Sequence, residues 1–369
     1  MSRPVIVQLD LDALLSNVKC LRKIAPQSKI LAMVKANAYG HGLVPIARAL
    51  ASSVEGFGVS CSEEALVLRN AGITQRIVLM EGMFSAAELP LLIRYQLDTV
   101  LHDTQQLAFL AQHPLSRPVN VWLKLNTGMN RFGLINQDFL EVLRLVQECP
   151  WLNVVCLMTH FASADKSDQS STQRQINNFE QVTNDLLIES SLANSAAILR
   201  WPNCHRDWIR PGLMLYGVSP FLETSGADHG LKPVMQLKSE LITINSLLKG
   251  DRVGYGGVWV APSRRRVGVV AIGYGDGYPH NAPQGTPVLV NNKRVELAGQ
   301  VSMDTLTVDL FSQPMAKPGD PVHLWGAGLP LEAIARSASS FRYELLCGIN
   351  RGQLVRMRIE EIRDAKKIS

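Results

Sequence analysis

The sequence lacks paired cysteines and long apolar segments, and both absences exclude classes of protein. Its 369 residues include six cysteines, none in a Cys-x-x-Cys pair, so neither a disulfide framework nor a common zinc motif is expected. Free thiols suit a reducing compartment, and we expect a cytoplasmic protein. The N-terminal residues lack a basic leader followed by an apolar stretch. No segment reaches the roughly 18 uninterrupted apolar residues of a membrane span.

A strong excess of charge of one sign is also missing. The net charge is +5, and the densest basic group is the three-residue run 264–266. A nucleic-acid-binding stripe needs a longer basic cluster with interleaved aromatic residues, so we expect no nucleic-acid partner. No metal site is expected either, because His160 has no partner ligands at suitable spacing nearby. With 46% hydrophobic and 19% charged residues, the chain can bury a sizeable core. We expect a folded protein that acts on a small molecule.

Short apolar runs alternate with helical patterns up to about Pro233. Ile30–Val34 has no polar alternation, which is typical of a strand buried on both faces, and a helical pattern follows over Leu43–Ala51. Repeated eightfold, this alternation predicts a (β/α)8 barrel, with a doubly wound open sheet as the alternative because periodicity does not reveal closure. The eight strand candidates are Ile30–Val34, Phe57–Val59, Ile77–Met80, Thr99–Leu101, Val119–Leu125, Val154–Met158, Ala193–Ala197 and Leu213–Tyr216.

Beyond Pro233 glycine and proline become frequent, and the strands look short and alternating. This pattern predicts a mostly β second domain. We therefore expect residues 1–233 to form the barrel and residues 234–369 to form the β domain, with the first residues of the chain paired to the latter. The expected β-domain strands are Ser239–Asn245, Val267–Ile272, Val288–Val290 and Thr305–Leu310.

Lys35 directly follows the first apolar run. The C-terminal ends of barrel strands form the face where barrel active sites lie, and partial burial lowers the pKa of a lysine in a way that favours Schiff-base formation. Taken alone, a lysine in this position more often marks a strand end and reaches water. The flanking Gly40 and Gly42, with the polar tips of Tyr39 and His41, favour the functional interpretation.

The segment from Met33 to Gly42, Met-Val-Lys-Ala-Asn-Ala-Tyr-Gly-His-Gly, resembles the pyridoxal-phosphate attachment signature of bacterial alanine racemases. The resemblance extends from about Val5 to about Val355. It implies that Lys35 carries pyridoxal 5'-phosphate as an aldimine, and that a barrel precedes a β domain. It also implies an isomerase that interconverts L-alanine and D-alanine, a cell wall precursor.

Further segments resemble the family's cofactor and substrate contacts. Lys124 to Gly133 resembles a stretch in which Arg131 contacts the cofactor phenolic oxygen and the substrate carboxylate, with Asn126 where aspartate is common. In this segment the resemblance implies that Lys124 is carbamylated and orients Arg131. Arg210 is implied to face the pyridine nitrogen, with His160 beside it. An arginine does not release its proton near neutral pH, so the ring stays largely unprotonated, which disfavours transamination.

The resemblance implies that the cofactor phosphate is bound by hydrogen-bond donors that follow the seventh and eighth strands, a frequent phosphate site in barrels. Taken alone, Asn194-Ser195 is an ordinary turn dipeptide. The residues implied to hold the phosphate are Tyr39, Asn194, Ser195, Gly212, Leu213 and Tyr343.

The second proton carrier is expected in the β domain. Tyr255 lies between Gly254 and Gly256, which indicates a loop that presents its phenol, although buried tyrosines are more often core residues. The resemblance implies that Tyr255 acts on the L side of the substrate and Lys35 on the D side. It also assigns Tyr274 to the entrance and Met303 to substrate binding. Because Tyr255 is implied to act in the other subunit's site, we expect a homodimer.

Two other interpretations remain open. A related barrel amino-acid decarboxylase or a broad-specificity racemase would share the cofactor. A non-catalytic pyridoxal-phosphate-binding protein would need neither the β domain nor a second base.

Overall fold

A computed structural model describes residues 3–111, 114–349 and 353–357, the last segment by its backbone alone. Its contacts divide the chain into two compact units. Unit 1 comprises Met1–Asn17, Tyr39–His41 and Tyr216–Ser369, and unit 2 comprises Val18–Ala38 and Gly42–Leu215. The domain border expected after residue 233 stays a prediction.

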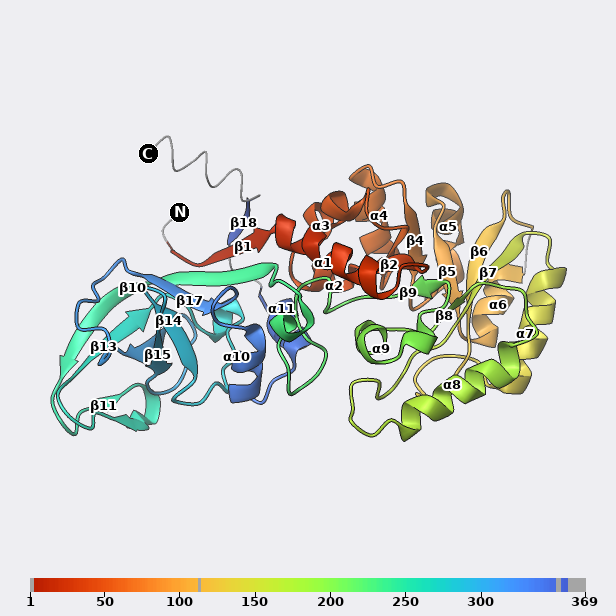
Figure 1. The fold of residues 1–369 in the computed structure, drawn as a ribbon. Coiled ribbons are helices and arrows are strands. Elements are labelled where there is room, and N and C mark those ends of the chain that lie inside the picture. Colours follow the sequence, from red (N-terminus) through yellow and green to blue (C-terminus); the bar gives the residue numbers. More distant parts are fainter. Residues whose placement is uncertain (1–2, 112–113, 350–352, 358–369) are drawn as a thin grey trace. The chain divides into compact units, whose positions relative to one another are not determined.

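Unit 2 is built around eight parallel strands in the order β8-β7-β6-β5-β4-β3-β2-β9 (Figure 1). The two ends of this order meet, because the Arg210 amide donates to the Ala193 carbonyl (2.9 Å) and a parallel bridge joins Asn194 to Arg210. The expected barrel is therefore confirmed and the open sheet is not observed. Its strands are β2 (Lys29–Met33), β3 (Gly56–Val59), β4 (Arg76–Leu79), β5 (Asp98–Leu101), β6 (Val119–Lys124), β7 (Leu152–Met158), β8 (Ser190–Ser191) and β9 (Trp208–Ile209).

The seventh and eighth strands were misplaced by the sequence pattern. Ala193–Ala197 was expected as a strand, but β8 lies just before it, and helix α9 (Ser195–Arg200) begins within it. The expected strand Leu213–Tyr216 lies after β9. Both true strands have two residues each, which is too short for an apolar run to mark them.

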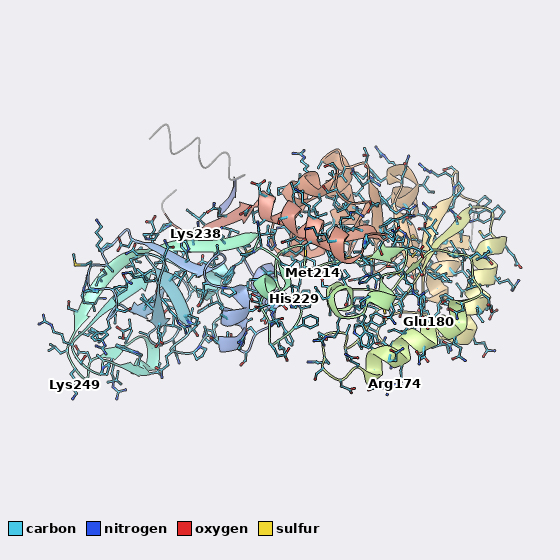
Figure 2. All side chains as sticks on the ribbon, in the orientation of Figure 1. Arg174, Glu180, Met214, His229, Lys238 and Lys249 are labelled. Atoms are coloured by element: carbon cyan, nitrogen blue, oxygen red, sulfur yellow. The ribbon has the colours of Figure 1, made fainter. Side chains whose placement is uncertain are left out.

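Helices connect consecutive strands of unit 2 (Figure 1). In α7, Phe139, Val142, Leu143 and Val146 are buried, and their spacing places them on one face of the helix. Arg174 and Glu180 both belong to α8 (Figure 2), where Glu180 pairs with Arg206. The connecting helices are α3 (Leu43–Leu50), α4 (Ser62–Asn70), α5 (Leu89–Tyr95), α6 (Thr104–Ala111), α7 (Asn136–Glu148), α8 (Ser170–Thr183) and α9.

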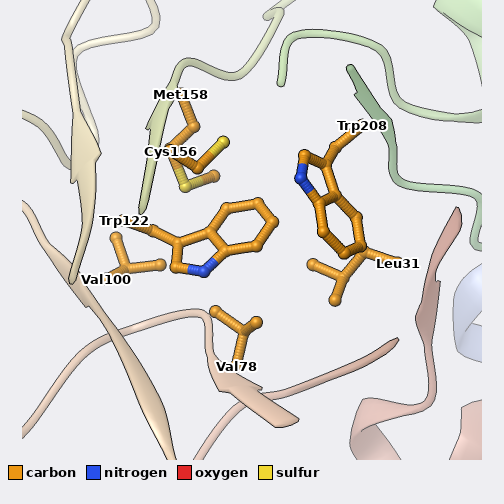
Figure 3. Packing of buried hydrophobic residues seen from close by; sticks show 7 residues of the cluster. All are labelled: Leu31, Val78, Val100, Trp122, Cys156, Met158 and Trp208. Atoms are coloured by element: carbon orange, nitrogen blue, oxygen red, sulfur yellow. The ribbon is translucent and has the colours of Figure 1, made fainter. Parts of the chain in front are cut away.

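The interior of the barrel is filled with side chains. Trp122 of β6 and Trp208 of β9 pack edge to face, with ring centroids 5.2 Å apart (Figure 3). The Trp122 indole donates to Asp98 Oδ2 at 3.1 Å. Closely packed large residues make this barrel a rigid scaffold for the loops at its ends. The cluster consists of Leu31, Val78, Val100, Trp122, Cys156, Met158 and Trp208.

Unit 1 contains a mostly antiparallel sheet whose order is β13-β16-β15-β14-β17-β10-β1-β18. The long strand β10 also pairs with β13, so six of these strands close on themselves, while β1 pairs with β10 and β18. The expected β domain is confirmed. Its strands are β1 (Ile6–Asp10), β10 (Met235–Leu247), β13 (Arg265–Val270), β14 (Pro287–Val290), β15 (Lys293–Leu297), β16 (Leu306–Asp309), β17 (Pro321–Trp325) and β18 (Gln353–Met357). A two-stranded sheet, β11 (Arg252–Val253) with β12 (Trp259–Val260), and the helices α10 (Leu331–Ser337) and α11 (Arg342–Cys347) complete it, and α1 (Leu11–Ile24) follows β1.

Arg3 fastens two loops of unit 1. Its guanidinium forms a bidentate contact with the fully buried carboxylate of Asp276 and donates to the Asp304 carbonyl at 2.6 Å. The hydrogen bond that Arg3 donates to Asp276 raises the pKa of Arg3. An Arg3→Met variant leaves the buried carboxylate without this partner, so we expect a loss of about 1–3 kcal/mol of unfolding free energy. Urea unfolding measures the loss. Arg3→Lys, which keeps the charge, should lose less, and equal stability of all three proteins would contradict this role.

In the part of the chain that the structure describes, no helix is both long and apolar enough to cross a membrane.

Candidate active site

A left-handed turn follows β2 and sets the place of Lys35. Within α2 (Lys35–Tyr39), three consecutive residues have φ of 53–54° and ψ of 44–52°, a conformation that costs roughly 1–2 kcal/mol for each L-residue. Contacts hold the turn: the Ala36 amide donates to Glu64 Oε1 (2.7 Å), and Asn37 Oδ1 accepts from the Leu43 amide (2.8 Å). Such strain persists where the surroundings fix it, and it is typical of functional sites.

Lys35, Lys124, Arg131 and Arg210 form a group of positive charges in unit 2. Each of the other three lowers the pKa of Lys124, and all four lower that of His160. Glu81 is the acidic group among those that act on Lys124, and its Oε1 lies 3.6 Å from Lys35 Nζ. The side chain of Lys35 is about one-third exposed (36%), so its amine is accessible. An excess of positive charge here suits an anionic ligand.

Lys124, the last residue of β6, is buried at 6% exposure. Burial, followed by the charges of Arg210, Arg131 and Lys35, lowers its pKa to about 7. Its Nζ lies 5.4 Å from the ring centroid of Phe132. A large share of the Lys124 amine is therefore neutral near physiological pH, unlike that of an ordinary lysine.

Arg210 follows β9 and is held by several acceptors. Its guanidinium donates to the Ser191 carbonyl (2.8 Å), Ser191 Oγ (2.6 Å) and the Thr159 carbonyl (2.6 Å), and it lies 3.5 Å from His160 Nδ1. Burial lowers the pKa of Arg210 to about 10, so it keeps its proton at neutral pH. His160 is half-buried, and desolvation and then Arg210 hold its pKa well below the usual value. The structure thus places His160 beside Arg210 as a neutral ring.

Four of the six residues expected at the phosphate group, Asn194, Ser195, Gly212 and Leu213, belong to unit 2. Ser195 Oγ accepts from the Gly212 amide at 2.9 Å, and Asn194 caps α9 by accepting from the Ala197 amide at 3.1 Å. The Met33 amide donates to the Pro211 carbonyl (3.0 Å), which places this segment beside the end of β2. Leu213 follows Gly212 and is buried.

Tyr39 and Tyr343 are brought together in unit 1. Their ring centroids lie 5.7 Å apart, and Tyr39 also packs against Tyr216 at 5.0 Å. Burial raises the pKa of Tyr39, so its phenol stays protonated and can donate a hydrogen bond. Gly40 permits the approach to α11, because a Cβ there would lie 2.1 Å from the Leu346 carbonyl oxygen.

The remaining expected residues of unit 1 lie on neighbouring loops. Tyr255 begins the turn Tyr255–Gly257 and is 71% exposed. The turn Tyr274–Asp276 is bonded to the next loop, because the Tyr274 amide donates to the Ser302 carbonyl (3.0 Å) and the Gly275 amide to the Met303 carbonyl (2.8 Å). Tyr274 and Met303 are therefore adjacent, and both are partly exposed.

Sequence reasoning missed two residues of this region, Glu81 and Ser191. Glu81 directly follows the expected strand Ile77–Met80, so the signal that singled out Lys35, a charged residue at the end of an apolar run, also applies to it. Ser191 had no such signal, because its strand is too short to be marked by hydrophobic residues.

Comparisons with known proteins cover nearly the whole chain. Residues 9–220 match the alanine racemase N-terminal domain, and residues 234–357 match the alanine racemase C-terminal domain. An alanine racemase of Shewanella denitrificans is 48% identical over 343 residues, covering 92% of this chain and 94% of the relative, and that of Aeromonas hydrophila is 48% identical over 347 residues, covering 93% and 96%. The crystal structure of the biosynthetic alanine racemase of Pseudomonas aeruginosa is similar with a TM-score of 0.93 and 42% identity, covering 96% of this chain and 99% of that one. The chain belongs to the alanine racemase family.

Proposed function

We propose that this chain interconverts L-alanine and D-alanine, with Lys35 and Tyr255 as the two proton carriers. The observation that supports this most is the accessible amine of Lys35 among the positive charges of unit 2. A barrel-end lysine that forms a covalent bond with an aldehyde needs this accessibility. The surrounding positive charges would stabilise an anionic phosphate and phenolate oxygen.

The residues of unit 2 fit pyridoxal phosphate, the cofactor of the family. Ser195 and the Gly212 amide would hold the phosphate, and Arg131 the phenolic oxygen and the substrate carboxylate. When bound, this cofactor withdraws electrons and makes the Cα proton of alanine acidic. Arg210 would face the ring nitrogen, and because it stays charged at neutral pH it withholds a proton from that nitrogen.

Two proton carriers are needed on opposite faces of the substrate carbon. Lys35 Nζ would hold the proton on the D side, and the phenol of Tyr255 on the L side. Tyr274 would line the entrance, and Met303 would contact the substrate. Tyr39 and Tyr343 would add phenol donors to the phosphate group.

We further propose that the chain acts as a homodimer in which Tyr255 of the partner subunit completes each site. Tyr255, Met303 and Tyr274 are 71%, 51% and 40% exposed in unit 1. Large side chains gathered on an exposed surface are typical of an interaction site. We place the protein in the cytoplasm, in keeping with a sequence whose six cysteines include no Cys-x-x-Cys pair.

Racemisation by the purified protein tests the proposed function. Full-length protein with pyridoxal phosphate should convert pure L-alanine to an equal mixture of both enantiomers, followed by optical rotation or chiral chromatography. Persistent L-alanine with bound cofactor would favour a non-catalytic cofactor-binding protein. Carbon dioxide release from a basic amino acid would favour a decarboxylase.

Ser195→Ala should weaken cofactor binding. The variant removes a hydroxyl that would donate a hydrogen bond to the phosphate, a loss of about 1–3 kcal/mol of binding free energy that corresponds to roughly tenfold weaker affinity or more. Titration of the apoprotein with pyridoxal phosphate measures the affinity. Ser190→Ala removes a hydroxyl that lies 3.4 Å from Asp207 Oδ2 and serves as the control. Equal affinities of the two variants would contradict the proposal that Ser195 binds the phosphate.

Carbamylation of Lys124 should depend on pH. A carbamate forms from carbon dioxide and a neutral amine, so it is favoured above a pKa of about 7 and lost as the pH falls through that value. We expect a carbamate signal with ¹³C-labelled bicarbonate at about pH 8.5, and its loss near pH 6. Nuclear magnetic resonance of wild-type protein and Lys124→Met, which should give no signal, checks this. A signal that is absent from wild type, or that persists in the variant, would contradict it.

A further inference from the structure

We propose that Glu81 is a positioning residue that holds the ε-ammonium group of Lys35 when this group is not bonded to the cofactor. This inference rests on the proposed function of Lys35. The observed contact joins Glu81 Oε1 and Lys35 Nζ at 3.6 Å, and the two side chains are 33% and 36% exposed. The pair is thus shielded in part from water, which screens fully exposed pairs more strongly.

The backbone of Glu81 is fixed in its place after β4. Its carbonyl accepts from His102 Nε2 at 2.9 Å and from Gln106 Nε2 at 3.3 Å. The next residue, Gly82, has φ of +73°, and a Cβ there would lie 2.2 Å from Gln106 Nε2 and 2.4 Å from the Val100 carbonyl oxygen. The loop is therefore anchored on both sides, and the carboxylate is held near the end of β2.

Glu81 is also the negative charge in a positive neighbourhood. Arg210, Arg131 and Lys35 lower the pKa of Lys124, whereas Glu81 raises it. A carboxylate within about 4 Å of an amine favours the charged form of that amine. Among these neighbours, Glu81 is therefore the negative charge that pairs with the amine of Lys35.

The contact has two opposite chemical consequences. An ammonium group has no lone pair with which to attack an aldehyde, so Glu81 slows the attachment of cofactor to the apoprotein. When Lys35 is not bonded to the cofactor, Glu81 would hold its ammonium group close to the site. The proton would pass between Lys35 Nζ and the substrate carbon, and Glu81 would act only by holding Lys35 in place.

The test compares wild type with Glu81→Gln in two measurements. In the first, apoprotein is mixed with pyridoxal phosphate near neutral pH, and covalent attachment is followed by absorbance and by borohydride reduction. We expect attachment to Glu81→Gln to be about three- to fivefold faster. In the second, the loaded enzyme should have a kcat about tenfold lower, with KM changed less than kcat. A variant damaged in its fold would slow both processes, so opposite changes identify the positioning role.

Two further variants complete the design. Glu63→Gln removes the same charge from an exposed residue of α4 and should behave as wild type. Glu81→Asp keeps the charge on a shorter side chain, so its attachment rate and its kcat should lie between those of wild type and Glu81→Gln. If Glu81→Gln does not fold, Glu81→Asp still allows both measurements. Attachment to Glu81→Gln and Glu81→Asp at the wild-type rate or slower would overturn the proposal, even where wild type racemises alanine. Faster attachment would uphold it even if wild type does not racemise alanine.

Discussion

Lys35→Ala is expected to give a folded protein that neither bonds covalently to pyridoxal phosphate nor racemises alanine. The variant removes both the proposed attachment point and the proposed D-side proton carrier, so turnover should fall by at least about 10⁴-fold. The side chain is about one-third exposed and its pair with Glu81 spans 3.6 Å, so unfolding free energy should change by less than about 1 kcal/mol. Chiral chromatography and thermal unfolding measure the two effects.

Lys29 provides a matched control at the other end of the same strand. It begins β2, is 44% exposed and pairs with Glu189, so Lys29→Ala removes a charge without touching the proposed site. This variant should keep turnover near that of wild type. Residual turnover in Lys35→Ala equal to that of Lys29→Ala would exclude the proposed role of Lys35.

Tyr255→Phe should reduce racemisation in both directions by about 10²–10⁴-fold, because the phenol of Tyr255 is the proposed L-side proton carrier. The side chain is 71% exposed, so neither the fold nor the covalent bond at Lys35 should be affected. Initial rates from L-alanine and from D-alanine, with the absorbance of bound cofactor, provide the measurement. Tyr95→Phe, in α5, removes a hydroxyl with no proposed role and should keep full activity.

Mixing the two inactive variants tests whether the sites are shared. If Tyr255 of the partner subunit completes each site, a hybrid of Lys35→Ala and Tyr255→Phe subunits has one intact site. A randomly exchanged equal mixture should then regain about a quarter of wild-type turnover. If the mixture gains no turnover after subunit exchange has been demonstrated, both proton carriers of a site belong to the same chain.

The β/α alternation and the position of Lys35 could be predicted because buried parallel strands appear in the sequence as apolar runs. β2 to β7 each have four to seven residues, enough to be seen. The two-residue strands β8 and β9 cannot be recognised in this way, because their positions depend on hydrogen bonds to neighbouring strands rather than on their own composition. The apolar residues expected in their place begin a helix or follow the strand end.

The turn after Lys35 shows another limit of local patterns. Ala36 and Ala38 favour right-handed helix, yet both have left-handed angles. The contacts of Glu64 and Leu43 that hold the turn come from distant or later parts of the chain, and no local propensity contains them. Gly40 and Gly42 marked the segment as unusual without giving its handedness.

The candidate site was predictable where a family motif supplied the residues, and not where tertiary structure did. Arg210 was expected beside His160, but its hydrogen bonds to Ser191 and Thr159 arise because β7, β8 and β9 lie side by side. The same applies to Glu81, whose partner Lys35 is on another strand. Charges that follow separate strands meet only when those strands assemble into the sheet.

The central claim is the covalent bond between the Lys35 amine and pyridoxal phosphate, and borohydride reduction followed by peptide mapping tests it most directly. The reduced cofactor should be found on the peptide that contains Met33–Gly42, with the mass increase at Lys35, and Lys35→Ala should give no labelled peptide. A label on a different lysine, or a protein that binds the cofactor and yields none, would contradict it.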